Sequence, residues 1–411
     1  MRNLFIISTI SLFIFVNVLA NLEVLAQNGW QQQTSGTTST LLGVVMTDQV
    51  TAYACGINGI ILKSTNGGLN WFDLNTGTNR FLRSITYVTN ETIYSAGELG
   101  IIIKTTNGGA NWITLNSGTN NTFVNIHFSD TQNGAAVGLN GTIARTNNAG
   151  DTWQVQQSGV NVELTGVFFT DAFTDYVTGF GGLVLKTTNN GVNWNQLTTG
   201  VTNDLRAVYF TDFNNGYVCG IGGRVIKTTD AGATWSNIAS GTGNGLYSVK
   251  FSGNSTGYIC GTGRILKTTN NGLNWQNQPI SITSDLYSID FSDELNGLAV
   301  GQNGVILKTI SGGIGIIQIS NEVPVKFALH QNYPNPFNPS TNIIFDLSGS
   351  SHVKISVFDV TGRLVEIIAD EFLRAGKYQI DWHTEELPSG VYICRIETES
   401  YRNSIKMILL K

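Results

Sequence analysis

The stretch KTTNGGANW at residues 104–112 decides how most of this chain folds, because near-copies of it recur along the sequence. The apolar, β-branched run before it predicts a strand. Asn and Gly then turn the chain, since both tolerate positive φ. The tryptophan opens a returning strand, where its large ring can be buried. The stretch therefore predicts a β-hairpin. The other copies begin at Lys63, Arg145, Lys186, Lys227, Lys267 and, in a decayed form, Lys308.

The tryptophan that ends this motif recurs at an almost constant interval. Successive positions lie 41 residues apart, except for the last pair, which lies 40 apart. A period near 40 with about four strand-like segments per unit is typical of β-propeller blades. The repeat predicts an all-β chain with a seven-bladed β-propeller over residues 27–313. The tryptophans that we expect to build the blades are Trp30, Trp71, Trp112, Trp153, Trp194, Trp235 and Trp275.

The ring needs a strand to close it, and two segments are candidates. Trp30 has no hairpin before it, and the last unit has Ile316 where tryptophan would fall. The N-terminal strand, residues 29–33, can therefore complete blade seven and protect its sheet edge. The alternative is that residues 315–319 supply the strand. We favour Trp30, because only that segment fills the tryptophan position.

The first 26 residues predict a signal peptide, with Arg2 before an apolar stretch that is short for a membrane span. Val-Leu-Ala ends at Ala20 and again at Ala26, and we favour cleavage after Ala26. Charged residues are only 12% and the net charge is −5, which gives no electrostatic case for nucleic acid as a partner. A chain of 411 residues also exceeds what one core normally supports, so we expect two folded domains.

Three of the four cysteines, Cys55, Cys219 and Cys260, occupy one position of the repeat, where other blades carry small residues. This pattern predicts buried core thiols. A Cys219–Cys260 disulfide is the alternative, but neighbouring blades are usually too far apart. Cys394 stands alone near the C-terminus. No pair has the spacing of metal ligands, so we predict no metal and no cofactor.

After a predicted linker over residues 314–326, the repeat gives way to alternating strands. The entry NYPNPFNP (332–339), the hairpin VFDVTGR (357–363), SGVY (389–392) and the end KMILLK (406–411) follow in that order. These motifs resemble the C-terminal sorting domain of type IX secretion substrates. The resemblance implies a small Ig-like β-sandwich over residues 327–411. It also implies an outer-membrane translocon and a sortase-like peptidase as partners, and a product that is secreted or attached to the cell surface.

The hairpin motif resembles the Asp-box, or BNR repeat, of sialidase-like propellers. The copy with Asp230, Gly232 and Trp235 has the family form, whereas Asn replaces Asp elsewhere. In that family the box is a structural hairpin, so the resemblance implies no catalysis. The blades also resemble those of photosystem II assembly factors, which act as chaperone-like binding scaffolds. A photosynthetic role is not implied, because the sorting domain indicates a different cell envelope.

The basic residue of every motif copy invites a functional interpretation, since a cationic ring could bind a polyanion. A feature present in every blade more often builds the blade. In the first copy, the stem of Lys63 can cover Trp71 on the facing strand. We therefore interpret the basic residues as structural.

Function in a propeller more often lies where the symmetry breaks. The second residue of the innermost strand varies from blade to blade, as do the loops before it. These residues should gather at one mouth of the central channel. We interpret the mouth as a binding face for an unknown surface protein or glycan, and the alternative is exposed residues without a ligand. The candidates are Arg80, Arg83, Arg206, Tyr247 and Tyr287.

A sialidase-like glycoside hydrolase is the alternative function. It would need three arginines, a tyrosine nucleophile with its glutamate, and an acidic aspartate. Arginine and tyrosine are present, but no motif places them as that family does. Only His127 among four histidines lies in the propeller, which makes a Ser-His-Asp triad hard to assemble. We predict no catalytic residue and a non-enzymatic scaffold.

Overall fold

The computed structural model describes residues 29–411 except 279, 311, 313–315, 321 and 385–386. The predicted signal peptide therefore lies outside the described residues. Over the part of the chain that is described, no helix has the length and apolarity needed to cross a membrane.

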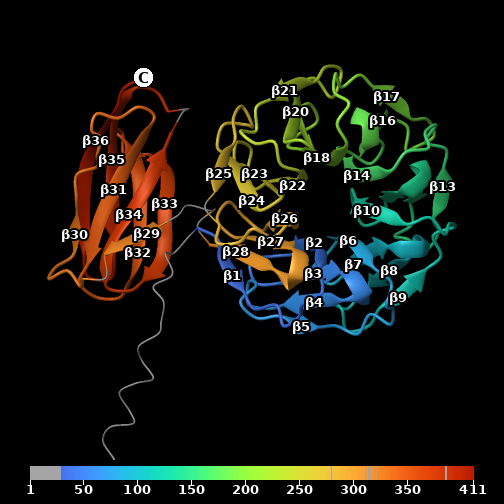
Figure 1. Ribbon diagram of the computed structural model, residues 1–411, viewed down its shortest axis with the longest axis horizontal. Coiled ribbons are helices and arrows are strands. Elements are labelled where there is room, and N and C mark those ends of the chain that lie inside the picture. Colours follow the sequence, from blue (N-terminus) through green and yellow to red (C-terminus); the bar gives the residue numbers. More distant parts are fainter. Residues whose placement is uncertain (1–28, 279, 311, 313–315, 321, 385–386) are drawn as a thin grey trace, which may run out of the picture.

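Seven four-stranded antiparallel sheets stand around a central axis, as the ring in Figure 1 shows. This confirms the seven-bladed propeller. In each of the first six blades the strands follow one another from the axis outward. Short 3-10 turns join the second and third strands of five blades, namely η1 (Ile57–Gly59), η2 (Glu98–Gly100), η3 (Leu139–Gly141), η4 (Phe180–Gly182) and η5 (Gln302–Gly304).

The strands of the blades have the following bounds. Blade 1 contains β2 (Leu41–Met46), β3 (Ala52–Gly56), β4 (Ile61–Ser64) and β5 (Phe72–Asp73). Blade 2 contains β6 (Leu82–Tyr87), β7 (Ile93–Gly97), β8 (Ile102–Thr105) and β9 (Ile113–Leu115). Blade 3 contains β10 (Phe123–Phe128), β11 (Gly134–Gly138), β12 (Ile143–Thr146) and β13 (Gln154–Gln156). Blade 4 contains β14 (Leu164–Phe169), β15 (Asp175–Gly179), β16 (Leu183–Thr187) and β17 (Asn195–Leu197). Blade 5 contains β18 (Leu205–Phe210), β19 (Gly216–Gly220), β20 (Arg224–Thr228) and β21 (Ser236–Ile238). Blade 6 contains β22 (Leu246–Phe251), β23 (Gly257–Gly261), β24 (Arg264–Thr268) and β25 (Gln276–Gln278). Blade 7 contains β26 (Leu286–Phe291), β27 (Gly297–Gly301), β28 (Ile306–Thr309) and β1 (Gln31–Gln33).

The two inner strands carry most of the core of each blade. In blade 5, β19 is buried along its whole length, because neighbouring blades cover both of its faces. The inner strand β18 buries its first, fourth and sixth residues and leaves the others half-buried. A β-bulge lies between its first and third residues, Leu205 and Ala207, and the same irregularity recurs in all seven blades. Such a bulge re-aims a side chain, and here it turns the second residue toward the axis.

The ring is closed by strands from both ends of the propeller. β1 pairs antiparallel with β28, which places Gln31 opposite Lys308. Trp30 precedes β1 and is buried in blade 7, where its ring meets Phe291 edge-on at 5.8 Å between centroids. The prediction that the Trp30 strand closes blade seven is confirmed.

The turn of the repeated motif is held by its own side chains. In the fifth copy, Thr228 Oγ1 accepts a hydrogen bond from the Gly232 N–H, and Asp230 Oδ1 accepts one from the Thr234 N–H, both at 2.9 Å. Gly232 has a φ of 84°, a conformation that favours glycine. Asn107 accepts the equivalent bond in the second copy, also at 2.9 Å. Asparagine therefore replaces aspartate without loss of the turn.

The basic residue of the motif reaches the next blade with its charged end. The Tyr94 hydroxyl and Lys104 Nζ both donate to the carbonyl of Ala149 in the next blade, at 2.7 and 2.8 Å. The ammonium lies 5.4 Å from the centroid of the Tyr94 ring. The predicted cation–π contact with tryptophan is wrong, because strand pairing places Tyr94 opposite Lys104 and the ammonium lies over tyrosine. The structural role of the basic residues is thus a contact between blades. The same pair is formed by Tyr53 and Lys63 on Gly108, Tyr176 and Lys186 on Ala231, and Tyr217 and Lys227 on Asn271.

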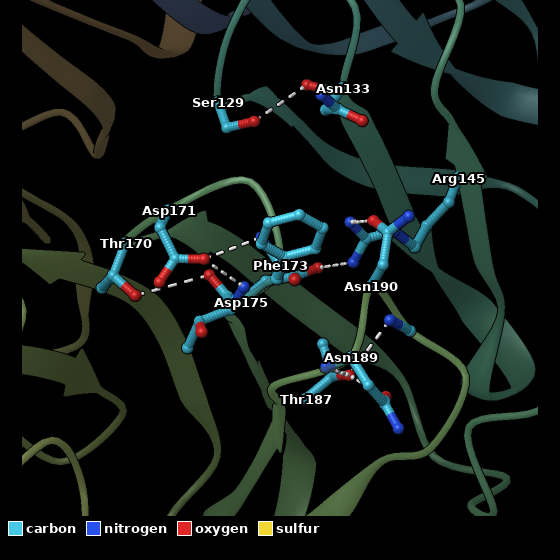
Figure 2. Close-up of polar contacts among 12 residues, drawn as sticks. Ser129, Asn133, Arg145, Thr170, Asp171, Phe173, Asp175, Thr187, Asn189 and Asn190 are labelled. Atoms are coloured by element: carbon cyan, nitrogen blue, oxygen red, sulfur yellow. Dashed lines mark hydrogen bonds and ion pairs between the residues drawn. The ribbon is translucent and has the colours of Figure 1, made fainter.

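The seam between blades 3 and 4 uses different residues, which Figure 2 shows. Ala135 stands where the tyrosine would be, and the Arg145 guanidinium lies 5.0 Å from the centroid of Phe169 instead. Arg145 forms a buried ion pair with Asp175 and donates to the side-chain oxygen of Asn190. Burial raises the pKa of Asp175 to about 6, although Arg145 acts in the opposite direction. Charge therefore joins these two blades, whereas a tyrosine and a lysine that bind one carbonyl join the four pairs of blades described above.

All four cysteines are free and buried. The core-thiol prediction is confirmed, and the alternative Cys219–Cys260 disulfide is wrong. Burial raises the pKa of Cys55 and of Cys219 to about 12, so both stay protonated.

The C-terminal domain consists of two four-stranded sheets that share one core. The predicted β-sandwich is therefore confirmed as two packed sheets, and its Ig-like assignment stays a prediction. The first sheet has the order β29 (Ile316–Ser320), β34 (Gly376–His383), β31 (Ser340–Leu347), β30 (Ala328–Leu329). The second has the order β33 (Leu364–Leu373), β32 (Ser351–Asp359), β35 (Gly390–Glu397), β36 (Arg402–Leu409).

β29 corrects the predicted linker over residues 314–326. It pairs antiparallel with β34, with Ile316 opposite Ile380. Ile316 is fully buried in the core of the sandwich. These residues form a strand because an apolar core is available to them there. The pairing also excludes the alternative in which residues 315–319 close the propeller.

Candidate functional site

A cavity of about 500 Å³ follows the propeller axis and is lined by the seven inner strands. Each inner strand contributes its second and fifth residues. We call the second residues the mouth ring, because they lie near the point where each inner strand begins. The mouth ring consists of Leu42, Arg83, Val124, Thr165, Arg206, Tyr247 and Tyr287. We call the fifth residues, toward the opposite end, the floor ring: Val45, Thr86, His127, Phe168, Tyr209, Lys250 and Asp290.

Two arginines give the mouth ring its charge. Nε of Arg83 and Nε of Arg206 are both buried, and neither finds a hydrogen-bond partner among the described residues. The Arg206 guanidinium lies 4.8 Å from the centroid of the Phe180 ring and 3.9 Å from the Glu163 carboxylate. The second distance is too long for a hydrogen bond. Glu163 therefore forms no hydrogen bond with Arg206, and the two arginines are the cations that the mouth ring presents to the channel.

Two tyrosines stand side by side in the same ring. The centroids of Tyr247 and Tyr287 are 5.5 Å apart. The Tyr247 hydroxyl is hydrogen-bonded to that of Thr262 at 3.0 Å, and the Tyr287 hydroxyl accepts from Gln302 Nε2 at 3.1 Å. Burial raises the pKa of Tyr287, so this phenol is neutral. The pair presents fixed aromatic surface beside the arginines.

Arg80, the fifth candidate, does not belong to this ring. It is exposed and lies outside the described channel lining, and its Nη1 donates to the Leu99 carbonyl at 3.5 Å. Arg80 lies in a loop, where the repeat does not determine the direction of a side chain, so its side chain does not point into the channel. The structure thus brings Arg83, Arg206, Tyr247 and Tyr287 together, and their binding role stays a prediction.

The floor ring holds a cluster that the sequence analysis missed. His127 stacks on Phe168 with 4.9 Å between centroids, and Phe168 meets Tyr209 at the same distance. Lys250 lies over the Tyr209 ring and pairs with Asp290 at 2.8 Å. The signal was present in the repeat, because all these residues occupy the fifth position of their strands.

The charges of the floor ring compensate one another. Burial disfavours the charged form of Lys250, but Asp290, Tyr209 and Tyr87 together outweigh this effect and the pKa of Lys250 is raised. Burial, with a further contribution from Lys250, lowers the pKa of His127 to about 4. His127 is therefore neutral at pH 7. The positive charge at the mouth comes from Arg83 and Arg206, and Glu163 lies 3.9 Å from Arg206.

Comparison with known proteins places both domains in families. Residues 22–119, 111–202 and 193–282 match the family described as photosynthesis system II assembly factor YCF48. This chain belongs to the YCF48 family. Downstream of the YCF48-type propeller, residues 331–411 match the secretion system C-terminal sorting domain, which indicates that the chain is exported. No curated protein matches the sequence.

Solved structures agree with the assignment of a YCF48-type propeller. A structure of YCF48 bound to D1 peptide is 18% identical and has a TM-score of 0.60, covering 69% of this chain and 95% of that one. YCF48 from Cyanidioschyzon merolae is also 18% identical, with a TM-score of 0.58 and coverage of 68% and 98%. The WD40 propeller domain of Doa1 is 15% identical, with a TM-score of 0.59 and coverage of 68% and 96%. These likenesses show the propeller fold alone.

Proposed function

We propose that this YCF48-type propeller is a non-enzymatic binding scaffold whose mouth ring binds an extended, acidic segment of a partner protein. The observation that carries the proposal is that Arg83 and Arg206, the two arginines of the mouth ring, both line the channel. A carboxylate in the channel would supply a strong, charge-assisted acceptor for their guanidinium groups. Tyr247 and Tyr287 would cover apolar parts of the segment. The structure of a YCF48 with a peptide supports a peptide ligand over a glycan.

The sorting domain sets where binding takes place. A translocon and a sortase-like peptidase of the type IX system would recognise residues 327–411, as the resemblance implies. The propeller would then act at the cell surface or after release. Its partners would be surface or extracellular proteins.

The contacts in the channel favour binding over the sialidase-like alternative. The described lining contains Arg83 and Arg206 where a sialidase would need three arginines. The mouth-ring tyrosines are bonded to Thr262 and Gln302, not to glutamate. The carboxylate of Asp290 is paired with Lys250, which leaves it poorly placed to act as an acid.

The test uses the purified chain and two labelled peptides, hexaglutamate and hexalysine, in fluorescence-anisotropy titrations. We expect hexaglutamate to bind and hexalysine not to bind. The Arg83→Ala, Arg206→Ala double variant should weaken hexaglutamate binding at least about 10-fold, because a hydrogen bond to a charged group contributes about 1.5–3 kcal/mol.

Arg80→Ala is the matched control, since it removes one exposed positive charge outside the channel. Its affinity for hexaglutamate should stay within about twofold of the original, the range expected for a weak surface charge effect. Equal weakening by Arg80→Ala would contradict a specific mouth site. Arginine-dependent binding of an oligogalacturonide but not of hexaglutamate would move the proposal to an anionic glycan. Turnover of a fluorogenic sialoside would overturn the non-enzymatic role.

A further inference from the structure

The segment between β29 and β30 is unusually open. Among its residues Glu322, Val323, Val325 and Lys326 are exposed, and Val325 is fully so. Within the described structure, its backbone makes one hydrogen bond, from the Glu322 N–H to the Ser320 hydroxyl at 3.1 Å. Exposed backbone without hydrogen bonds is the preferred substrate of endopeptidases.

β29 precedes this segment in sequence but belongs to the domain that follows it. Its register with β34 pairs Ile316 with Ile380 and Gln318 with Tyr378. Ile316 is fully buried in the sandwich core, whereas Ile319 on the same strand is exposed. The matched sorting region begins only at residue 331, downstream of both β29 and the open segment.

Resting on the processing that the sorting-domain resemblance implies, we propose that the cut falls within residues 322–326, downstream of β29, and therefore leaves the sorting domain attached to the propeller through β29. In the cut, water adds across one peptide bond. The propeller fragment gains a C-terminal carboxylate, and the sorting fragment gains an N-terminal ammonium group. The product is a non-covalent complex of two chains.

The pairing of β29 with β34 explains why the fragments stay together. Main-chain hydrogen bonds of an added strand provide affinity, and a buried side chain provides specificity. Departure of β29 would expose the edge of β34 and leave a cavity where Ile316 was buried. Release of the sorting domain would therefore need a second event that removes the strand.

The first experiment uses the cleavage sites that the chain already has. A glutamate-specific endopeptidase can cut after Glu322, and a lysine-specific one after Lys326. Under native conditions we expect these to be the earliest cuts, identified by mass spectrometry. The fragments should separate on a denaturing gel and co-elute from a size-exclusion column at 1 μM. An earliest cut elsewhere would overturn the processing site, and separate elution would overturn the retention.

Two variants assign the retention to β29. Ile316→Asp places a charge in the core, and Ile319→Asp places the same charge on the exposed face of the same strand. After cleavage, Ile316→Asp should weaken retention at least about 30-fold, since truncating a buried isoleucine costs about 2 kcal/mol or more. Ile319→Asp fragments should co-elute as the original ones do. Equal behaviour of the two variants would refute retention through β29.

A competition experiment keeps the test valid if Ile316→Asp fails to fold. A synthetic peptide of residues 315–321, added in excess to the cut protein without substitutions, should displace the propeller fragment. A peptide of the same composition in scrambled order should not. In an exporting host, the mature propeller should end within residues 322–326, and an end before Ile316 would refute the proposal.

Discussion

Replacing Arg145 with alanine should destabilise the propeller more than any equivalent change at another seam. Asp175 has no exposed surface, and Arg145 is its ion-pair partner. Removing one member of a buried ion pair costs about 3–5 kcal/mol, because the other charge stays buried without compensation. Lys104→Ala is the matched control at the preceding seam. It should cost less than about 1.5 kcal/mol, because Tyr94 still binds the same carbonyl.

The loss of stability in the Arg145→Ala variant should depend on pH in a defined direction. The pKa of Asp175 is about 6 in the folded chain, above the ordinary value of 3.8. A carboxyl group with a raised pKa contributes stability that is complete below the unfolded pKa and is lost as the pH rises through the folded pKa. In the original chain Arg145 stabilises the charged form of Asp175 and so reduces this loss of stability at high pH. The alanine variant lacks this stabilisation. The deficit of the variant should therefore be larger at pH 8 than at pH 5.

Urea unfolding at both pH values, followed by tryptophan fluorescence, measures the deficit. Adding Asp175→Asn to the Arg145→Ala variant removes the buried charge and should recover a large part of the loss at pH 8. A deficit below about 1 kcal/mol at pH 8, the level of a surface ion pair, would refute the reasoning. An equal deficit at pH 5 and pH 8 would also refute it.

Three further results are expected. Trp30→Ala should lower the stability of the propeller by about 3–5 kcal/mol and make β1 sensitive to proteases. Gln32 is exposed on the same strand, so Gln32→Ala should have neither effect. Protection of β1 from proteases in Trp30→Ala would contradict its role in closure. The four cysteines should resist iodoacetamide in the folded chain, because they are buried and protonated, and prompt alkylation seen by mass spectrometry would show otherwise. Lys250→Met should destabilise the propeller, because it breaks the ion pair with Asp290. The affinity for hexaglutamate should stay unchanged, because the floor ring lies away from the mouth. A parallel loss of affinity would show that the two rings act together.

The periodic features of the fold could be predicted from the sequence. The spacing of the tryptophans gives the number of blades, and the incomplete first and last repeats indicate a shared blade containing Trp30. The second position of the inner strand identifies four channel residues, because the repeat fixes their phase. The fifth position carries the same information for His127 and Lys250, because the repeat fixes the phase of these residues as well.

Other features depend on partners that the repeat does not reveal. The lysines of the motif bind carbonyls in the next blade, so inspection of a single hairpin suggests tryptophan as the contact. Arg80 lies in a loop, where spacing does not determine direction. The strand around Ile316 is short and apolar and would suit a propeller edge or a sandwich edge equally. The strand belongs to the sandwich because the core of that domain accommodates Ile316, and this core is visible only in the folded structure.

The closure of blade 7 gives the propeller an order of assembly. β1 is synthesised early, but its partner β28 is the last propeller strand in the chain. Until then the N-terminal strand has nowhere to pair, and the first and seventh blades each lack a neighbour. The sorting domain begins a few residues after β28. In a chain that emerges from its N-terminus, all the strands of the circle are therefore present before the sorting domain is complete.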